Sequence, residues 1–488
     1  MYFRGESTAV EGSNVIDSGG VTLSNSFMVN DNRASEVAAI LRNRAASMRV
    51  GEKMPPVRQL SSEFQASAAT VSQAIAQLQA LGVVKAEPGR GTFVLGRDRG
   101  PEPDYSWQSQ SLGHARVDAR RTSRLGAYGT ADDIQLSWGY LAPELQPLED
   151  LRSLGARAAR SPRAWMMAPP FGLPDLRRVF SEEFHTDPSD VLIVPGGQQA
   201  LVYALRTLAE PGATLIAESP SYPGAMIAAQ AAGLELVAVP ADADGIRPDK
   251  LADALERTRA TVIYLQPCYA NPTGAVLSAS RREEVLRLAA RHGAFIIEDD
   301  WARHLSIDGR APAPLFTQDP DGHVVSIATL SKSAAPGLRV AAIAARGPAG
   351  ERLRTARIAD DMCVPPLVQE VALSLLTSNA WPRHLKRLRS HLAERRDVML
   401  GEIVATLPDV RVPHTPQGSI HLWAKLPEGT DTAALAAAAQ DAGVLIGDGG
   451  HFYFDEPPAA YIRLSYGAAS VPQISEGIRR IARLMERQ

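Results

Sequence analysis

The sequence has few cysteines and no long apolar run, and each shortage excludes a class of protein. Two cysteines, Cys268 and Cys363, cannot form a disulfide framework in 488 residues, which is typical of a reducing compartment. No stretch of about eighteen apolar residues occurs, so the sequence predicts no membrane-spanning helix. Residues 1–32 are polar, rich in Gly and Ser, and lack the apolar centre of a signal peptide, so we expect a flexible lead there. We therefore expect a cytoplasmic protein with no membrane partner.

Charge is nearly balanced over the whole chain but unevenly distributed along it. The formal net charge is −3, from 51 Lys and Arg against 54 Asp and Glu. Residues 33–97 hold nine Lys and Arg against four Glu, which is +5 and leaves −8 for the remainder. A small basic head on a large acidic body indicates that only the head binds an anionic partner. The length also predicts more than one domain.

The head, residues 33–97, has the pattern of a winged helix-turn-helix. Apolar residues at helical spacing predict three helices, the third ending at Gly82, and two short strands around a Pro-Gly-Arg-Gly turn follow them. Such a unit places its third helix in the major groove of double-stranded DNA. A winged helix that binds another protein is the alternative, and the basic charge favours DNA. The residues that we expect to contact DNA are Arg58, Ser67, Thr70, Ser72, Gln73, Arg90, Gly91 and Thr92.

The rest of the chain divides into a linker and an α/β body. Residues 98–131 are polar and rich in Gly, Pro and Arg, which predicts a linker with a short helix near residues 113–126. In residues 132–488, apolar strand-like runs alternate with amphipathic helices, which predicts a mostly parallel sheet with helices on both faces. Ligands of such sheets collect beyond the carboxyl ends of the strands. The small or polar residues at five of these ends are Gly196-Gly197, Tyr222, Asn271, Asp299 and Lys332.

These strand ends carry the groups needed to bind pyridoxal phosphate. Lys332, in SIATLSKSAAPGLR, offers an amine that forms an imine with an aldehyde. Asp299 offers a carboxylate for the pyridine nitrogen, and Asn271 a donor for the phenolic oxygen. A helix start after two glycines and a guanidinium suit the phosphate. The residues that we predict to bind the cofactor on these grounds are Gly196, Gly197, Gln198, Tyr222, Asn271, Asp299, Thr329, Ser331, Lys332 and Arg339.

Each of these signals has a plainer interpretation when it is taken alone. Lys332 could be a surface lysine in a loop, and the NPTG sequence at Asn271 could be an ordinary turn. The run Glu298-Asp299-Asp300 could bind a metal ion, although no His or Cys stands nearby at ligand spacing. The order and wide spacing of all five strand ends favour the cofactor.

Both parts of the chain resemble known families. MPPVRQLSSEFQASAATVSQAIAQLQALGVV and GRGTFV resemble the DNA-binding domain of the GntR regulators. PFGLPDLR, GGQQAL, ESPSY, NPTG, IIEDD, LSKSAAPGLR and YIRLSYG resemble a fold-type I, class I aminotransferase, which has a smaller C-terminal α/β subdomain. A GntR head on such a body resembles the MocR branch, the GabR-like transcription regulators.

This resemblance implies ligands and partners. Pyridoxal phosphate and an amino acid or amine would act as effector ligands, and the head would bind promoter DNA. Arg463, in YIRLSYG, matches the arginine that binds the α-carboxylate. The dimers of the family are head-to-tail, so we expect a homodimer of that kind.

The head departs from the GntR pattern at one position. Ala68 stands where that family usually has an arginine directly after the turn serine. We therefore expect more of the base reading to fall to Ser72, Gln73 and Gln77.

The body departs from the aminotransferase pattern around the cofactor. Met167, or Met166 if the loop shifts, replaces a tyrosine that crosses the dimer interface to the phosphate; filling of a core or an interface is the alternative role. Trp301 replaces a tyrosine that binds the phenolic oxygen, and its indole can only donate; simple packing is the alternative. Pro195 and Gly197 replace small hydroxyl residues of the phosphate turn. These changes loosen the polar surroundings of the cofactor.

Three functions are compatible with this sequence. The first is a DNA-binding transcriptional regulator that senses an amino acid or amine through pyridoxal phosphate and Lys332. The second is an active aminotransferase with an accessory winged helix, and the complete basic head argues against it. The third is a DNA-binding protein with a vestigial cofactor site, and the presence of Lys332 and Asp299 argues against it.

Overall fold

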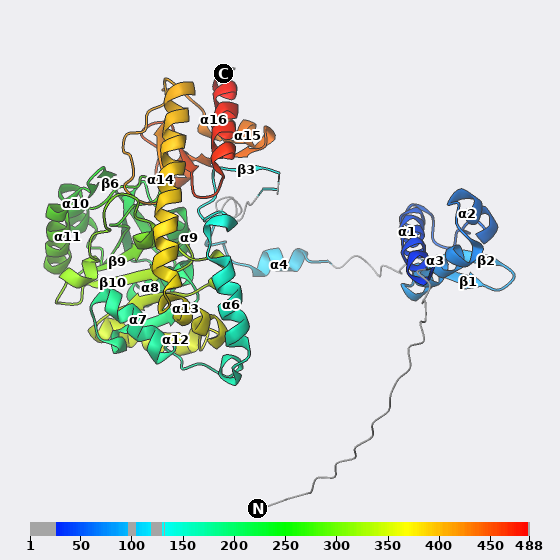
Figure 1. The fold of residues 1–488 in the computed structure, drawn as a ribbon. Helices are drawn as coiled ribbons and strands as arrows, with labels where there is room; N and C mark the ends of the chain where they lie inside the picture. Colours follow the sequence, from blue (N-terminus) through cyan, green and yellow to red (C-terminus); the bar gives the residue numbers. More distant parts are fainter. Residues whose placement is uncertain (1–25, 96–103, 119–128, 131, 487–488) are drawn as a thin grey trace, which may run out of the picture. The chain divides into compact units, whose positions relative to one another are not determined.

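The computed structural model describes residues 26–95, 104–118, 129–130 and 132–486 (Figure 1). The chain forms two compact units, residues 1–113 and residues 114–488, which are described separately below. Between the head and the body, the described part of the chain contains one short helix, α4 (Ser106–Ser111). The helix predicted near residues 113–126 falls mostly outside the described residues.

The first unit contains the predicted winged helix-turn-helix. The helices are α1 (Ser26–Ser47), α2 (Val57–Glu63) and α3 (Ala68–Ala80), and the wing pairs β1 (Val84–Glu87) with β2 (Gly91–Val94) in antiparallel register. Val37, Leu41, Leu60, Val71 and Leu78 form its buried centre. Helix α1 begins at Ser26, within the segment that we expect to be a flexible lead.

The second unit is built on an eight-stranded sheet in the order β4-β11-β10-β9-β8-β5-β6-β7. Strands β10, β9, β8, β5 and β6 are parallel to their neighbours in this series. Strand β11 is antiparallel to both β10 and β4, and β7 is antiparallel to β6. The strands are β4 (Val191–Val194), β5 (Thr214–Ser219), β6 (Glu235–Asp242), β7 (Gly245–Ile246), β8 (Val262–Leu265), β9 (Phe295–Asp300), β10 (Val324–Thr329) and β11 (Ala341–Ala344). The mostly parallel sheet is therefore confirmed.

Helices cover both faces of this sheet, as the continuous apolar strands require. Within β4, Ile193 packs toward one face, whereas Leu192 and Val194 pack toward the other. The first face carries α7 (Pro174–Phe184), α10 (Pro248–Thr258), α11 (Ala279–His292) and α13 (Pro366–Leu376). The second face carries α8 (Gly197–Leu208), α9 (Pro223–Ala231) and α12 (Gly347–Asp360).

A smaller α/β subdomain closes the unit at its C-terminal end. Its antiparallel sheet has the order β12-β15-β14, and a second pair joins β13 to β3 in parallel. The long helix α14 packs against α16 in this subdomain and against α13 near the large sheet (Figure 1). The elements are β3 (Ile134–Gln135), β12 (His421–Lys425), β13 (Val444–Leu445), β14 (Gly447–Asp448), β15 (Tyr461–Ser465), α14 (Ala380–Thr406), α15 (Thr432–Asp441) and α16 (Val471–Met485).

Short connections complete the second unit. Helix α6 (Leu148–Ala159) precedes the 3₁₀ turn η2 (Pro162–Trp165), and the other 3₁₀ turns are η1 (Pro143–Leu145), η3 (Pro188–Asp190), η4 (Arg303–Leu305), η5 (Leu315–Gln318), η6 (Pro336–Leu338) and η7 (Gly449–Phe452). Across the described ranges, no helix combines the length and the apolar character needed to cross a membrane.

Candidate cofactor and effector site

Five predicted site residues meet at one edge of the large sheet. Strands β5, β8, β9 and β10 are parallel, and β4 runs the same way as β10 because both are antiparallel to β11. The carboxyl ends of these five strands therefore point to a single edge. The residues at or just beyond those ends are Gly196, Tyr222, Asn271, Asp299 and Lys332.

Lys332 follows β10, and its amine is enclosed by neighbouring groups. The Nζ atom donates a hydrogen bond of 2.7 Å to the carbonyl oxygen of Gly139 and lies 3.6 Å from the ring centroid of Tyr140. Burial, followed by the nearby charge of Arg463, lowers the pKa of Lys332 to about 7, although the charge of Asp299 opposes this change. A large share of the amine is therefore neutral at pH 7, which is the nucleophilic form.

Asp299, near the end of β9, is buried and receives two hydrogen bonds on one oxygen. The hydroxyl of Tyr264 and the side-chain amide of Gln266 donate to Oδ2 at 2.7 and 2.9 Å. Burial raises the pKa of Asp299 above its ordinary value, and the two donors and the charge of Lys332 offset only part of that rise. The carboxylate is thus buried but supported by three favourable interactions.

The neighbouring acid Glu298 lies on the opposite face of the strand and holds a backbone turn. Its two carboxylate oxygens accept the N–H groups of Leu315 and Phe316 at 2.7 and 3.2 Å. Because side chains alternate along a strand, Glu298 cannot act with Asp299 on a single ion. Its role is to fix the start of η5.

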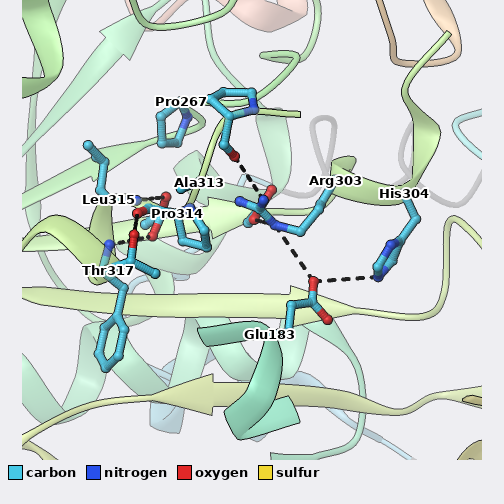
Figure 2. A network of polar contacts seen from close by, with 12 residues as sticks. Glu183, Pro267, Arg303, His304, Ala313, Pro314, Leu315 and Thr317 are labelled. Atoms are coloured by element: carbon cyan, nitrogen blue, oxygen red, sulfur yellow. Dashed lines mark hydrogen bonds and ion pairs between the residues drawn. The ribbon is translucent and has the colours of Figure 1, made fainter. Parts of the chain in front are cut away.

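The third acid of the run, Asp300, belongs to an ion-pair cluster. It pairs with Arg303, which lies 3.6 Å from Glu183, and Glu183 lies 3.5 Å from the imidazole of His304. Figure 2 shows Glu183 placed between Arg303 and His304. Within the described ranges, no three His, Cys, Asp or Glu residues are grouped as a metal site would require. The acidic run therefore provides one cofactor candidate, Asp299, and two structural carboxylates.

The start of α8 forms a cradle with Arg339. Gly196 has φ 94° and ψ 161°, and a β-carbon placed there would lie 2.6 Å from the guanidinium carbon of Arg339. That guanidinium donates to the carbonyl oxygen of Pro195 at 3.1 Å. A β-carbon on Gly197 would lie 3.5 Å from Thr329. The start of α8 therefore lies close to both the Thr329 side chain and the Arg339 guanidinium. Backbone N–H groups, a hydroxyl and a guanidinium gathered in this way suit the binding of an anion.

Asn271 and Arg463 connect the large sheet to the C-terminal subdomain. The Nη1 atom of Arg463, on β15, donates to Oδ1 of Asn271 at 2.9 Å, and Nη2 donates to the carbonyl oxygen of Ser137 at 2.5 Å. The guanidinium carbon also lies 4.8 Å from the ring centroid of Phe452. Burial lowers the pKa of Arg463 to about 10, so the side chain remains cationic at neutral pH.

Trp301 lies in the same region through its contact with His421. Their ring centroids are 5.8 Å apart and nearly parallel, at 29°. A β-carbon on Gly139 would lie 3.8 Å from the His421 ring and 3.6 Å from Lys332 Nζ. The side chains of His421 and Lys332 therefore border the same space beside Gly139. Burial, followed by the charges of Arg463 and Lys332, lowers the pKa of His421 well below its ordinary value and keeps the imidazole neutral.

Tyr222 and Gln198 also meet at this edge. The Tyr222 hydroxyl donates to Oε1 of Gln198 at 3.0 Å, and the Gln198 amide donates to the carbonyl oxygen of Gly224 at 2.9 Å. Burial, followed by the neighbouring Tyr140 and the charge of Asp299, raises the pKa of Tyr222, while the charges of Arg463 and Arg339 lower it.

The surroundings of Lys332 fit a bound pyridoxal phosphate. The buried polar atoms there that have no hydrogen-bond partner among the described residues include Ser331 Oγ, Trp301 Nε1, His421 Nδ1 and Arg463 Nε. Buried polar groups without partners are costly and usually mark a ligand or an ordered water. Together with the cradle at Gly196, they supply a donor set for a phosphorylated ring with an adjoining carboxylate.

The comparisons with known proteins agree with this geometry. Residues 133–481 match the family "Aminotransferase class I and II", and residues 33–94 match "Bacterial regulatory proteins, gntR family". The uncharacterized HTH-type transcriptional regulator YdfD of Bacillus subtilis is 32% identical over 88% of this chain and 91% of its own. The chain belongs to the MocR/GabR-type regulators of the aminotransferase class I and II family.

A sequence match and a structure match show how closely these regulators resemble aminotransferases. The 2-aminoadipate transaminase of Thermus thermophilus is 31% identical over 72% of this chain and 90% of its own. The crystal structure of LysN, the α-aminoadipate aminotransferase of the same species complexed with N-(5'-phosphopyridoxyl)-L-leucine, superposes with a TM-score of 0.73 at 29% identity. This match covers 78% of this chain and 98% of that one. Members of the class I and II family use pyridoxal phosphate, which is the cofactor predicted from the sequence.

The methionines that depart from the aminotransferase pattern lie on the surface of the unit. Met166 and Met167 are 66% and 73% exposed, and the preceding Trp165 is 69% exposed although its indole N–H donates to Ala159 at 2.9 Å. The alternative of core filling is therefore wrong for Met166 and Met167.

The predicted DNA-contacting residues divide into exposed and buried ones. Ser67 is the N-cap of α3, and its Oγ accepts the N–H of Thr70 at 3.1 Å. Thr70 itself is only 4% exposed and donates its backbone N–H to the Ser67 cap, so its burial argues against the predicted contact with a base. Arg90 is exposed on the wing and pairs with Glu87 at 2.7 Å. The other predicted residues are exposed (Arg58, Ser72, Gln73) or half-buried (Gly91, Thr92).

Five residues of the lysine site carried no signal that we used in the sequence. Tyr264 and Gln266 hold Asp299, while Gly139, Tyr140 and His421 surround the Lys332 amine. The polar residue at the end of the apolar run VIYLQ could have indicated Gln266, because it occupies a strand end like the other site residues.

Proposed function

We propose that this protein is a cytoplasmic DNA-binding transcriptional regulator that holds pyridoxal phosphate at Lys332 and thereby senses an amino acid or amine. The observation that carries the proposal is the half-buried Lys332, whose amine donates to the carbonyl oxygen of Gly139 at 2.7 Å and lies 3.6 Å from the ring centroid of Tyr140. Burial is the main cause that lowers its pKa to about 7. The same chain contains a complete winged helix at residues 33–94, which supports a regulatory role rather than an enzymatic one.

The described residues have distinct tasks in this proposal. Asp299 would contact the ring nitrogen, Asn271 the phenolic oxygen, and the cradle of Gly196 and Arg339 the phosphate. When bound, pyridoxal phosphate supplies an aldehyde that reacts with primary amines. Lys332 provides the resting amine partner, and its low pKa keeps it available near neutral pH.

Effector recognition would fall to Arg463 and its neighbours. A guanidinium binds a carboxylate in a two-pronged manner, so an amino acid would compete for the bonds that Arg463 makes to Asn271 and Ser137. Those bonds join β15 of the C-terminal subdomain to segments outside its sheet. An effector that replaces them would change how the C-terminal subdomain is held against the large sheet, and a ligand-controlled regulator needs a change of this kind.

The proposal includes a head-to-tail homodimer. Trp165, Met166 and Met167 form an exposed apolar stretch on the second unit, and such stretches are typical of protein contacts. Multi-angle light scattering of the full chain tests this part. We expect a dimer that Met167→Glu weakens, and a monomeric wild type would refute the dimer.

The experiment that tests the main proposal is reconstitution of the full-length chain with pyridoxal phosphate. The wild type should acquire a visible absorbance band that Lys332→Ala abolishes. Lys250→Ala, which alters an exposed lysine paired with Asp253, is the matched control and should keep the band. Equal bands in wild type and Lys332→Ala would refute the site. Anisotropy of a labelled upstream duplex should then change when the effector is added.

Transaminase activity is the second candidate function. The 31% identity to a 2-aminoadipate transaminase favours it. The two functions are distinguished by adding a 2-oxo acid and measuring amino-group transfer to it by chromatography. An enzyme transfers many equivalents, whereas a sensor stops after one.

A further inference from the structure

Gln266 uses three polar groups to join three separate segments of the site. It follows β8 and is only 2% exposed. Its backbone N–H donates to Glu218 Oε1 at 2.7 Å, and its side-chain amide donates to Asp299 Oδ2 at 2.9 Å. Its side-chain oxygen accepts the N–H of Asn271, also at 2.9 Å. One planar amide thus touches both residues assigned to the cofactor ring.

The amide group restricts the relative positions of Asp299 and Asn271. Because its donor and acceptor lie on one rigid plane, a shift of either partner would break one of the two side-chain bonds. Asp299 has a second donor on the same oxygen, the hydroxyl of Tyr264 at 2.7 Å. That hydroxyl holds Asp299, whereas the amide of Gln266 bonds to both residues and so couples the two ring contacts.

The Gln266 amide also affects the charge of Asp299. Burial raises the pKa of Asp299, and the bonds from Tyr264 and Gln266 together with the charge of Lys332 counteract that rise. Glu218, the buried acid that accepts the Gln266 backbone N–H, has its pKa raised to about 8 by burial and by the charge of Asp299, against the effect of that bond. Asp299 is therefore the acid that the network favours as a carboxylate.

We propose that Gln266 is a positioning residue that holds Asp299 charged and aligned with Asn271, and thereby keeps the ring nitrogen of bound pyridoxal phosphate protonated. The inference rests on the proposed function, since it assumes that the cofactor binds at Lys332. A charged Asp299 stabilises a proton on the ring nitrogen, whereas a neutral or turned carboxyl does not.

The test uses full-length protein reconstituted with pyridoxal phosphate that carries ¹⁵N in its ring. The ¹⁵N chemical shift, followed against pH, reports directly whether the nitrogen is protonated. Gln266→Met removes both side-chain bonds at similar size but leaves the backbone bond to Glu218. We expect the deprotonation midpoint to fall by about one to two pH units, the size expected for a lost hydrogen bond to a charged group.

Two further variants keep the proposal falsifiable. Tyr264→Phe removes the other donor to Asp299 and should lower the midpoint in the same direction, even if Gln266→Met fails to fold. Gln369→Met is the matched control, because Gln369 is also fully buried and bridges Leu173 N–H and the Val364 carbonyl oxygen, at 2.8 and 2.7 Å. It should destabilise the fold without moving the midpoint.

The outcomes separate this inference from the proposed function. An unchanged midpoint in Gln266→Met, or one that moves only as in Gln369→Met, overturns the role of Gln266. If Gln266→Met does not fold, an unchanged midpoint in Tyr264→Phe overturns the network. A wild type that binds no pyridoxal phosphate refutes the proposed function itself.

Discussion

Gly196 and Gly197 are adjacent glycines, yet the structure predicts opposite results for replacing them by alanine. Gly196 has φ 94° and ψ 161°, a backbone conformation that essentially only glycine adopts. A methyl group there would also lie 2.6 Å from the guanidinium carbon of Arg339. At Gly197 the methyl group would lie 3.5 Å from Thr329, an ordinary contact, and the backbone is not in the left-handed region.

The size of the effect follows from these two features. Backbone strain of this kind costs about 1–3 kcal/mol, so Gly196→Ala should lower the free energy of unfolding by that amount. The methyl group must also displace Arg339 from the helix start. Loss of one hydrogen bond to a charged group costs about 1.5–3 kcal/mol, so pyridoxal phosphate should bind about 10–100-fold more weakly.

Two measurements separate the contributions. Urea denaturation of the cofactor-free protein gives the change in the free energy of unfolding, and an absorbance titration gives the affinity for pyridoxal phosphate. Arg339→Ala alone should weaken the cofactor without backbone strain. Gly197→Ala should change both quantities by much less than Gly196→Ala. Similar losses in the two alanine variants would refute the cradle formed by Gly196 and Arg339.

Three further predictions concern reactivity, effector choice and DNA. Because only a neutral amine reacts, the rate of pyridoxal phosphate uptake should rise about tenfold per pH unit below the Lys332 pKa of about 7 and level off above it. A stopped-flow rate that is flat below pH 7 would contradict this. Arg463→Gln should weaken carboxylate-bearing effectors about 10–100-fold in absorbance titrations and leave simple amines unaffected, so equal losses for both classes would exclude a carboxylate role. Arg58→Ala with Arg90→Ala should reduce the salt slope of promoter binding by about two, measured by anisotropy with exposed Gln79→Ala as control; an unchanged slope would place the phosphate contacts elsewhere.

The strand-end residues were predictable because topology alone brings them together. Apolar runs that alternate with helices predict parallel strands, and parallel strands place their carboxyl ends at one edge. No contact had to be known to expect Asn271, Asp299 and Lys332 near one another. Gln266 bonds to both Asp299 and Asn271, at 2.9 Å each, which brings these two strand ends together as expected.

The groups that enclose the amine could not be predicted in this way. Gly139 accepts the Lys332 bond from 193 positions away, and its place depends on how the segment after β3 crosses the sheet edge. His421 begins a strand of another sheet, and its neighbours depend on how β12 packs against Trp301. Local patterns encode neither arrangement.

Thr70 shows a case in which closer attention to spacing would have helped. Thr70, Ala74 and Leu78 are four residues apart on α3, and all three are buried. A residue on the same face as two core positions points inward, whatever its polarity. The exposed Ser72 and Gln73 lie on another face, and their contact with DNA stays a prediction.

Arg463 and Lys332 are two basic groups in one half-buried site, and this predicts how a carboxylate should influence the amine. The charge of Arg463 is the largest cause, after burial, of the lowered pKa of Lys332. A carboxylate bound to Arg463 would offset that charge and raise the pKa of Lys332, so less of the amine would be neutral at pH 7. Propionate, which has no amine, should therefore move the pH midpoint of pyridoxal phosphate uptake upward in the wild type but not in Arg463→Gln. An identical shift in both would mean that the carboxylate acts at another cation, and no shift in either would mean that the two cations are not coupled.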